Sequence, residues 1–167
     1  MTPRRPPPAA KPPRLSLSVQ YALAATTLPV AATLRRWARA ALERDAAVTM
    51  RFVGTREGTR LNGVFRGQDH ATNVLTFVYD DATPLAGDIV LCAPVVRREA
   101  REQGKAFEAH CAHLVVHGML HLQGYEHETD REAAAMEARE TAILRTLSVA
   151  DPYTPTPAAR PRAAARA

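Results

Sequence analysis

The segment HGMLHLQGYEH, residues 117–127, contains three of the six histidines of the chain within eleven positions. In an α-helix, residues four positions apart lie on the same face, so His117 and His121 can direct two imidazoles at one metal ion. Gly124 can turn the chain through a conformation that most residues avoid, and His127 can then return as a third ligand. Three neutral imidazoles suit Zn²⁺ and leave a fourth tetrahedral position for water, as catalytic zinc sites require. The spacing predicts one zinc ion per chain, held by His117, His121 and His127.

Other ligand sets are possible within the same helix. His113 lies four residues before His117, so these two could also form a pair. Ligands at three successive turns would spread over ~12 Å along the helix axis, which is too far for one ion. The glycine turn therefore favours the set that ends with His127. We expect His110 and His113 not to be ligands, with support of a ligand as the lesser alternative. Imidazoles also accept nickel, copper or iron, so the identity of the metal stays open.

The residue after the first histidine limits the chemistry. The spacing H-x3-H-x2-G-x2-H is that of metzincin proteases, and HExxH proteases use the glutamate after the first histidine as general base. Here that residue is Gly118, and the nearest acid, Glu126, flanks a ligand from the loop side. Peptide hydrolysis by that mechanism is disfavoured. A metal could still polarise a phosphodiester, which would need a cationic partner for its developing charge.

The chain has 167 residues, a length typical of one domain with a sizeable core. The two cysteines, Cys92 and Cys111, imply no disulfide framework and favour a reducing compartment. The apolar run 15–32 is interrupted by Gln20 and Pro29, and we interpret it as part of the fold rather than as a signal peptide. These features predict a cytoplasmic protein without a membrane span.

The net charge of +5 comes from the two ends of the chain. Residues 1–14 carry four basic residues and residues 153–167 carry three, with no acid in either segment. Residues 15–152 hold 15 basic and 17 acidic residues, so the basic pI gives no evidence for a basic nucleic-acid groove in the domain. Both ends are low in complexity, and we predict disordered basic tails at 1–14 and 154–167. Such tails could add non-specific attraction to RNA phosphates.

Between the tails, hydrophobic periodicity predicts an α+β fold. We expect strands at 15–21, 48–53, 73–80 and 87–93, and helices at 29–42, 94–103, 106–122 and 129–147. The continuous apolar character of 73–80 and 87–93 indicates central strands covered on both faces. Glu57 and Gly58 are expected in a turn. Residues 61–65 could continue the sheet or form a short crossover.

Several sequence blocks in the same order resemble the YbeY family of bacterial zinc endoribonucleases. HGMLHLQGYEH is similar to that family's HGxLHLxGYDH signature, and LNGVFRGQDHATNVLTF (61–77) resembles its LNxxFRxxDxxTNVLSF block. GDIVLCAPVVRREAREQGK (87–105) and MEARETAILRTL (136–147), followed by ADPY, resemble its later segments. The resemblance spans residues 15–153, which we take as the domain.

The resemblance implies a single domain with a small mixed sheet of about four strands covered by about five helices. It implies zinc ligands at His117, His121 and His127, and a functional arginine at Arg66. The implied catalytic set is Arg66, His117 and His121. The sequence departs from the family pattern at Glu126 and Thr76, where the pattern has aspartate and serine, and both keep the chemical type. Three further polar residues are expected to shape loops rather than to contact substrate, namely Asp69, Asn73 and Asp88.

The implied activity is zinc-dependent, single-strand-specific cleavage of RNA, in maturation of the 16S rRNA 3′ end and in ribosome quality control. Implied partners are single-stranded RNA, the small ribosomal subunit and its assembly factors, including the GTPase Era. Two rival hypotheses remain. One is a zinc metalloprotease with an unconventional base, and the other is a non-enzymatic ribosome assembly factor with a structural zinc.

Overall fold

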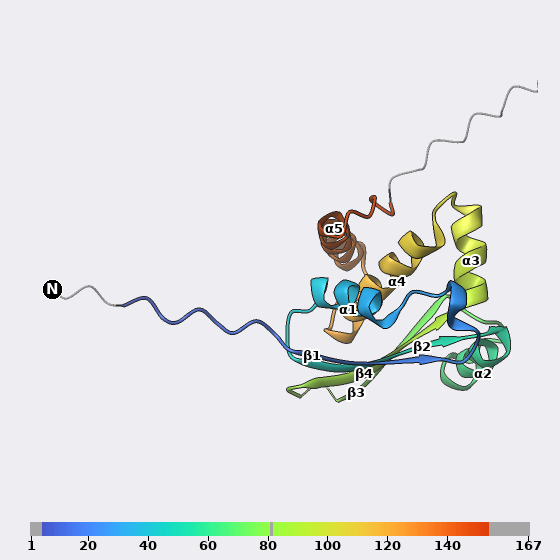
Figure 1. Cartoon of the computed structure of the whole chain (residues 1–167), viewed down its shortest axis with the longest axis horizontal. Coiled ribbons are helices and arrows are strands. Elements are labelled where there is room, and N and C mark those ends of the chain that lie inside the picture. The colour runs from blue at the N-terminus through green and yellow to red at the C-terminus, as the bar shows by residue number, and fades with distance from the viewer. Residues whose placement is uncertain (1–4, 81, 154–167) are drawn as a thin grey trace, which may run out of the picture.

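The computed structural model describes residues 5–80 and 82–153. They form a four-stranded sheet with the order β1-β2-β4-β3 (Figure 1). The strands are β1 (Leu15–Tyr21), β2 (Ala46–Val53), β3 (Val74–Asp80) and β4 (Leu85–Cys92). β1, β2 and β4 run parallel, and β3 pairs antiparallel to β4 at the edge. The expected mixed sheet of four strands is therefore confirmed.

Five α-helices and one 3-10 turn accompany the sheet in the described residues. The helices are α1 (Ala31–Ala40), α2 (Thr55–Arg66), α3 (Ala93–Glu102), α4 (Phe107–Leu122) and α5 (Asp130–Thr146). α1 and α4 cover one face of the sheet and α5 lies on α4, whereas α2 lies below the opposite face (Figure 1). The expected α+β class with about five helices is confirmed.

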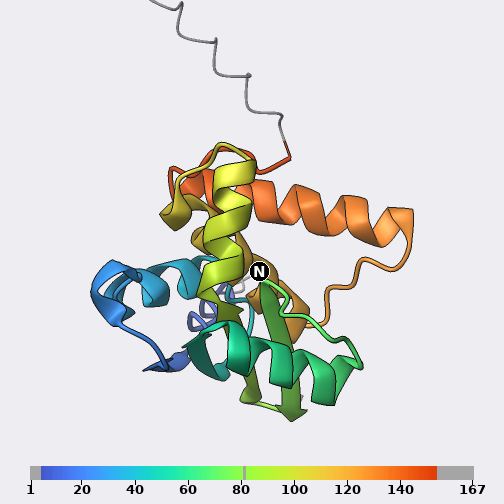
Figure 2. The same cartoon turned by 90° about the vertical axis from the view of Figure 1, so that its right-hand side faces the viewer.

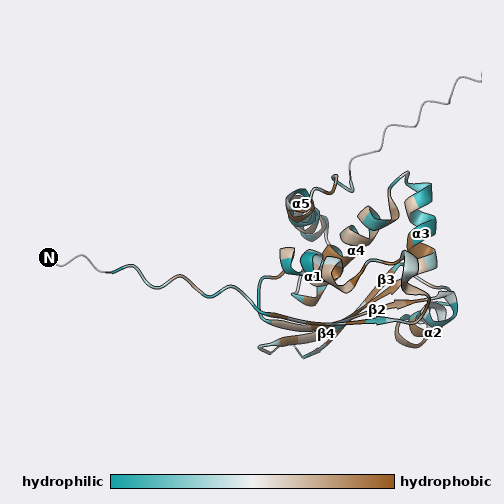
Figure 3. Cartoon of the chain, in the orientation of Figure 1, coloured by the Kyte–Doolittle hydropathy of each residue, from teal (hydrophilic) through white to brown (hydrophobic). Residues whose placement is uncertain are grey.

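The sheet separates two hydrophobic clusters because successive side chains of a strand point to opposite faces. In β4, Ile89 and Leu91 belong to the main core with α1 and α4, while Val90 and Cys92 belong to a smaller cluster beneath α2. Both faces of β4 are covered, as its continuous apolar sequence predicts. In Figure 3 the strands are largely apolar, and hydrophilic colours gather on α5 and on the outer end of α3.

The prediction of two central strands was wrong for β3. β3 is an edge strand, and its second half leaves Val78 49% and Tyr79 69% exposed. An apolar run of this length reports β propensity as well as burial, so the sequence alone did not distinguish an edge strand from a central one.

The predicted turn at Glu57 and Gly58 was also wrong, because both residues lie inside α2. Residues 61–65 are helical as well, so they do not continue the sheet. Gly58 disfavours a helix by propensity, but here it lets α2 approach the sheet. A Cβ at this position would lie 3.1 Å from Cys92 Sγ. The Glu57 carboxylate accepts two hydrogen bonds from Arg51 of β2, so tertiary contacts override the local signal.

The other predicted elements are confirmed with small shifts at their ends. β2 begins two residues earlier than expected, at Ala46. α1 buries Leu34 and Trp37 as predicted, but Val30 is its N-cap residue and is 63% exposed. None of the helices within the described ranges combines the length and the apolar character that a membrane span requires.

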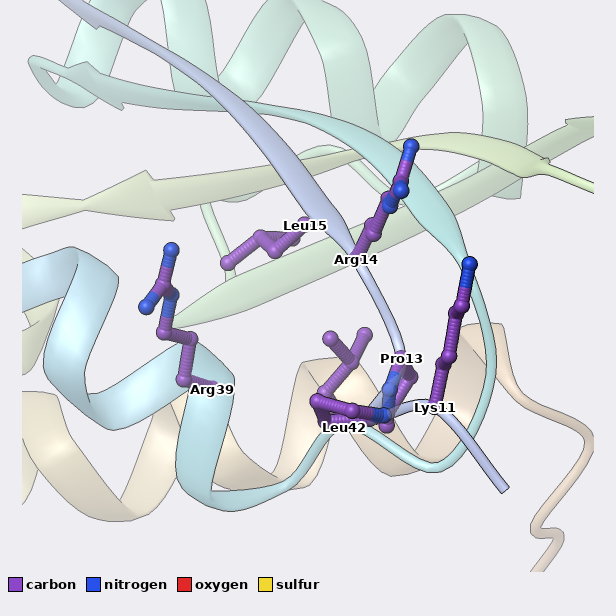
Figure 4. A pocket seen from close by; sticks show the side chains of 7 residues that line it. Lys11, Pro13, Arg14, Leu15, Arg39 and Leu42 are labelled. Atoms are coloured by element: carbon purple, nitrogen blue, oxygen red, sulfur yellow. The ribbon is translucent and has the colours of Figure 1, made fainter. Parts of the chain in front are cut away.

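The segment before β1 has neither helix nor strand between residues 5 and 14, and it is exposed. It lies beside the end of α1, where Lys11, Arg14 and Leu42 contribute to a shallow pocket (Figure 4). Arg39 lies on the other side of that pocket from the two tail cations, so the three charges do not converge. The disorder predicted for this tail stays a prediction, and the tail predicted at 154–167 lies outside the described residues.

Two glycines let α4 lie directly on β4. A Cβ on Gly118 of α4 would be 3.1–3.4 Å from side-chain atoms of Ile89. A Cβ on Gly87 of β4 would be 2.6 Å from the Phe77 carbonyl oxygen and 2.8 Å from Leu122 Cδ2. Gly87 is therefore a strand residue in close contact with the helix. The two contacts fix the depth of the last turns of α4 over the sheet.

We predict that Gly87→Ala destabilises the fold by about 1–3 kcal/mol, because the added methyl meets backbone that cannot move aside. Urea unfolding of the metal-free protein measures this change. Ser18→Ala on the exposed side of β1 is the control and should stay within about 0.5 kcal/mol of the parent. Equal stability of the Gly87 variant and the parent would show that the packing of α4 on β4 is looser than described.

Candidate metal centre

The candidate site is built on the last turns of α4, which carry His117 and His121. One side of this helix is deeply buried, through residues such as Val115, Met119 and Leu120. The two histidines point away from that side, and their side chains are 22% and 17% exposed. The helix therefore fixes both imidazoles on a rigid support next to solvent.

A tight turn ends α4 and brings the third histidine back. The amide of Tyr125 donates to the Leu120 carbonyl and the amide of Gly124 donates to the His121 carbonyl, which is the Schellman pattern of a helix end. Gly124 adopts φ 101°, in the left-handed region that favours glycine. The chain then runs outward toward α5 (Figure 2). His127 lies in this connection, after the end of α4.

The end of α1 holds this turn in place. The side-chain amide of Gln123 donates to the Ala41 carbonyl at 2.8 Å, and its oxygen accepts from the Glu43 amide at 2.6 Å. The Tyr125 hydroxyl donates to the Glu43 carboxylate at 3.0 Å, and Arg139 of α5 donates to the same carboxylate. Three helices thus fix the path of the chain between His121 and His127.

The structure brings the three predicted ligands together. The ring centroid of His121 lies 4.5 Å from that of His117 and 4.7 Å from that of His127, and the His117–His127 distance is 5.6 Å. One nitrogen from each ring lies within 4.8 Å of the others. Three converging imidazole nitrogens beside solvent fit one tetrahedral metal ion with an open position.

Electrostatics at His121 suit a metal ligand. Burial lowers the pKa of this imidazole, and the neighbouring rings of His117 and His127 lower it further. Glu126 and the backbone of Tyr125 act in the opposite direction, but the pKa remains below its ordinary value. A lowered pKa keeps the ring neutral near pH 7, and the neutral ring is the form that binds metals.

A buried carboxylate of α5, Glu140, borders the site. Its exposed fraction is 0%, and it accepts a short hydrogen bond from His117 Nδ1, a bond of 3.0 Å from His113 Nε2 and a short bond from the Tyr153 hydroxyl. Burial raises the pKa of this carboxyl, but the three hydrogen bonds outweigh burial and lower it to about 2. Glu140 is therefore an anion inside the protein.

Glu140 was missed in the sequence, although a signal was present. The apolar positions of the last helix include Met136, Ile143 and Leu144, and position 140 falls on the same face. A glutamate among core positions indicates a buried carboxylate with specific partners. Thr129 and Glu132 form a capping box that fixes the start of α5, and the helix then presents Glu140 to α4.

A second group of possible ligands shares one histidine with the first. His113, His117 and Glu140 also place one ligand atom each within 4.8 Å of the others. Their polar atoms are already joined in hydrogen bonds, and the carboxylate that links them has no exposed surface. The geometry favours the three-histidine group for a metal and separates His113 from it.

His110 lies in a different hydrogen-bond network. Its Nε2 is 2.8 Å from Glu99 Oε2, and burial lowers the pKa of the ring while Glu99 partly opposes that shift. Asn73 donates to the same carboxylate, and its side-chain oxygen accepts from the Val74 amide. These contacts join the start of β3 to α3 and α4, which is the loop-shaping role that we expected for Asn73.

Of the other residues expected to shape loops, Asp88 accepts a hydrogen bond of 2.6 Å from the Tyr79 hydroxyl and so joins β4 to β3. Asp69 is exposed and lies beside His70.

Arg66 is not in contact with the histidines. It is the last residue of α2, which packs on the face of the sheet opposite α4. Its side chain is exposed and makes no hydrogen bond or ion pair with another residue in the part of the chain that the structure describes. Phe65, beside it, packs edge-on against Phe77 of β3 at 4.8 Å. The structure therefore leaves the guanidinium accessible to a ligand in solution.

The position of the protease base is part of the core. Gly118 is buried against Ile89, so a glutamate there would have to enter the packing between α4 and β4. Glu126 stands at the mouth of the site, with one oxygen 4.0 Å from His121 Nδ1 and its side chain 57% exposed. The site thus differs from a HExxH protease in its packing as well as in its sequence.

Comparison with known proteins agrees with this architecture. Residues 21–148 match the family model described as Endoribonuclease YbeY. The protein named Endoribonuclease YbeY of Aromatoleum aromaticum is 59% identical over 143 residues, which are 84% of this chain and 93% of that protein. The protein of the same name from Nitrosomonas eutropha is 54% identical over 137 residues, 82% of this chain and 97% of its own length.

A solved structure shares the fold. The solution structure of TM1509 from Thermotoga maritima is 26% identical, with a TM-score of 0.52, and the match covers 83% of this chain and 99% of that one. The resemblance seen in the sequence motifs is thus confirmed by a match to the family over most of the described chain. The chain belongs to the YbeY family of endoribonucleases.

Proposed function

We propose that this protein is a zinc-dependent endoribonuclease that cleaves single-stranded RNA, with His117, His121 and His127 as the metal ligands. The observation that carries the proposal is the convergence of three imidazole nitrogens within 4.8 Å beside solvent. Membership of an endoribonuclease family gives RNA as the substrate class. The three ligands belong to one domain, proposed as residues 15–153.

Zn²⁺ in this site would supply Lewis acidity toward phosphate oxygens and water. The chain supplies the geometry, because α4 and the turn at Gly124 hold the rings in place before the metal binds. Arg66 supplies a cation, since a guanidinium can hold two phosphate oxygens at once. Arg66 is exposed at the end of α2, so its guanidinium can bind a phosphate of RNA that the metal centre holds.

We further propose that the substrate is ribosomal RNA, cleaved near the 3′ end of 16S rRNA and during ribosome quality control in the cytoplasm. The small ribosomal subunit and assembly factors such as the GTPase Era are the proposed partners. The slightly acidic composition of residues 15–152 supports delivery by partners, because a domain with little net positive charge gains little affinity from RNA phosphates in general.

His121→Ala should abolish bound zinc and RNA cleavage together, because two imidazoles hold a catalytic metal poorly. Metal analysis of protein purified without added metal, with cleavage of a labelled single-stranded RNA, measures both. His70→Ala is the matched control, since His70 is exposed and lies outside both groups of possible ligands. Casein cleavage that is lost in His121→Ala, with RNA left intact by the parent, would instead establish the protease hypothesis.

Arg66→Ala should keep its zinc and its stability but lower the turnover number for RNA about 10²-fold or more, because the guanidinium stabilises phosphate charge in the transition state. Arg56→Ala removes another exposed cation, from the first turn of the same helix, and is the matched control. Single-turnover kinetics separate the turnover number from RNA affinity. A variant that only raises KM would assign Arg66 to RNA binding alone.

The same Arg66 variant tests the non-enzymatic hypothesis in cells. If the protein acts as an endoribonuclease, cells that carry only Arg66→Ala should accumulate unprocessed 16S rRNA 3′ ends. Normal 3′ ends in those cells, with zinc still bound to the purified variant, would favour an assembly factor with a structural zinc.

A further inference from the structure

The carboxylate of Glu140 has no exposed surface, although an ionised group is costly to bury. Its neighbours on α5, Met136, Ile143 and Leu144, are core residues, so an apolar side chain of similar size would suit this position by packing alone. Replacing buried ionic groups with apolar ones is often neutral or stabilising. The anion therefore requires an explanation other than stability.

The contacts of Glu140 divide between its two oxygens. Oε1 accepts from His117 Nδ1, whereas Oε2 accepts from His113 Nε2 and from the Tyr153 hydroxyl. An ionised carboxylate can only accept, so each of these groups is the donor. Oε1 therefore bonds to His117 of the candidate metal centre, and the other two donors bond to Oε2.

The second oxygen is occupied in a way that keeps the carboxylate in place. His113 Nδ1 is buried and has no hydrogen-bond partner in the described residues, so the proton of this ring lies on Nε2, toward Glu140. Tyr153 follows a segment that Lys105 anchors, because the Lys105 ammonium donates to the Pro152 carbonyl at 2.9 Å. Glu140 is therefore held by α4 and by the chain after α5, independently of His117.

We propose that Glu140 is a positioning residue for the metal centre: its Oε1 holds the proton of His117 on Nδ1 and so presents the Nε2 lone pair to the metal. This inference rests on the proposed metal function. An imidazole offers its lone pair from only one nitrogen in each neutral tautomer, and an acceptor at the other nitrogen selects the tautomer and fixes the ring plane. Glu140 also places a negative charge behind one ligand, which increases the basicity of that ring.

The assignment also explains why His113 and His117 are both present, four residues apart, although only one belongs to the three-histidine group. His113 donates to the carboxylate and His117 receives its orientation from it. The buried pair of His113 and Glu140 is then a support for the site and not a second metal site.

The tautomer of His117 in the wild-type, metal-free protein tests the proposal without any substitution. Two-dimensional NMR of ¹⁵N-labelled imidazoles at about pH 8, where an ordinary histidine is neutral, distinguishes the protonated from the bare ring nitrogen. We expect His117 to carry its proton on Nδ1, with His127, which has no carboxylate contact in the described chain, as the internal comparison. A proton on Nε2 of His117 would overturn the proposal.

Zinc affinity tests the consequence for metal binding. Glu140→Gln keeps the shape of the side chain but leaves one acceptor oxygen and no charge. We expect its zinc dissociation constant, measured by competition with a chelating dye, to rise roughly 10- to 100-fold. Tyr153→Phe removes a donor from the same carboxylate but leaves Oε1 and His117 untouched, and it should stay within roughly threefold of wild type.

The outcomes separate this inference from the proposed function. Unchanged affinity in Glu140→Gln, or an equal loss in Glu140→Gln and Tyr153→Phe, would contradict a specific role for Oε1. If Glu140→Gln does not fold, the tautomer of His117 in the wild-type protein tests the proposal by itself. If wild-type protein binds no zinc, the proposed metal function fails, whereas the tautomer still reports whether Glu140 controls His117.

Discussion

The packing of α4 between the sheet and α5 is the constraint on which the rest of the structure depends. On one side, Gly87 and Gly118 allow the helix to approach β4 closely, because Leu122 packs on Gly87 and Ile89 packs on Gly118. On the other side, Glu140 of α5 bonds to two histidines of the same helix. The histidine pair of α4 is thus fixed by a close contact on one side and by a buried anion on the other. A shift of the helix by one residue would rotate His113 and His117 away from Glu140 of α5.

This arrangement also explains why a protease-like spacing need not produce a protease. The position that holds the base in HExxH enzymes is used here to let a helix approach a sheet, so it cannot carry a carboxylate. The buried carboxylate next to the site instead comes from α5 and points at a ring nitrogen. The same three-histidine spacing is thus combined with a buried carboxylate that bonds to a histidine ring nitrogen. This placement of the carboxylate, away from solvent, suits a substrate that is itself negatively charged, as RNA is.

Local signals predicted much of the fold and of the histidine cluster, because both depend on short sequence distances. The spacing of His117 and His121 and the glycine at 124 are enough to predict a shared ion, and Thr129 marks the start of α5. Features that depend on distant contacts were missed. Gly58 was predicted to lie in a turn because its contact with Cys92, 34 residues later, cannot be seen in the neighbouring sequence. β3 was predicted to be central because an apolar run does not show whether its strand lies at the edge of the sheet. Glu140 gave a signal through its place on an apolar stripe, but its partner His117 lies 23 residues earlier and only the fold brings the two together.

The most direct test of the central claim is X-ray absorption spectroscopy of protein purified without added metal. The account predicts zinc with three imidazole nitrogens at about 2.0–2.1 Å and a further light-atom ligand. A spectrum with sulfur ligands, or with a single imidazole among carboxylate oxygens, would contradict the three-histidine centre built by α4 and the turn at Gly124.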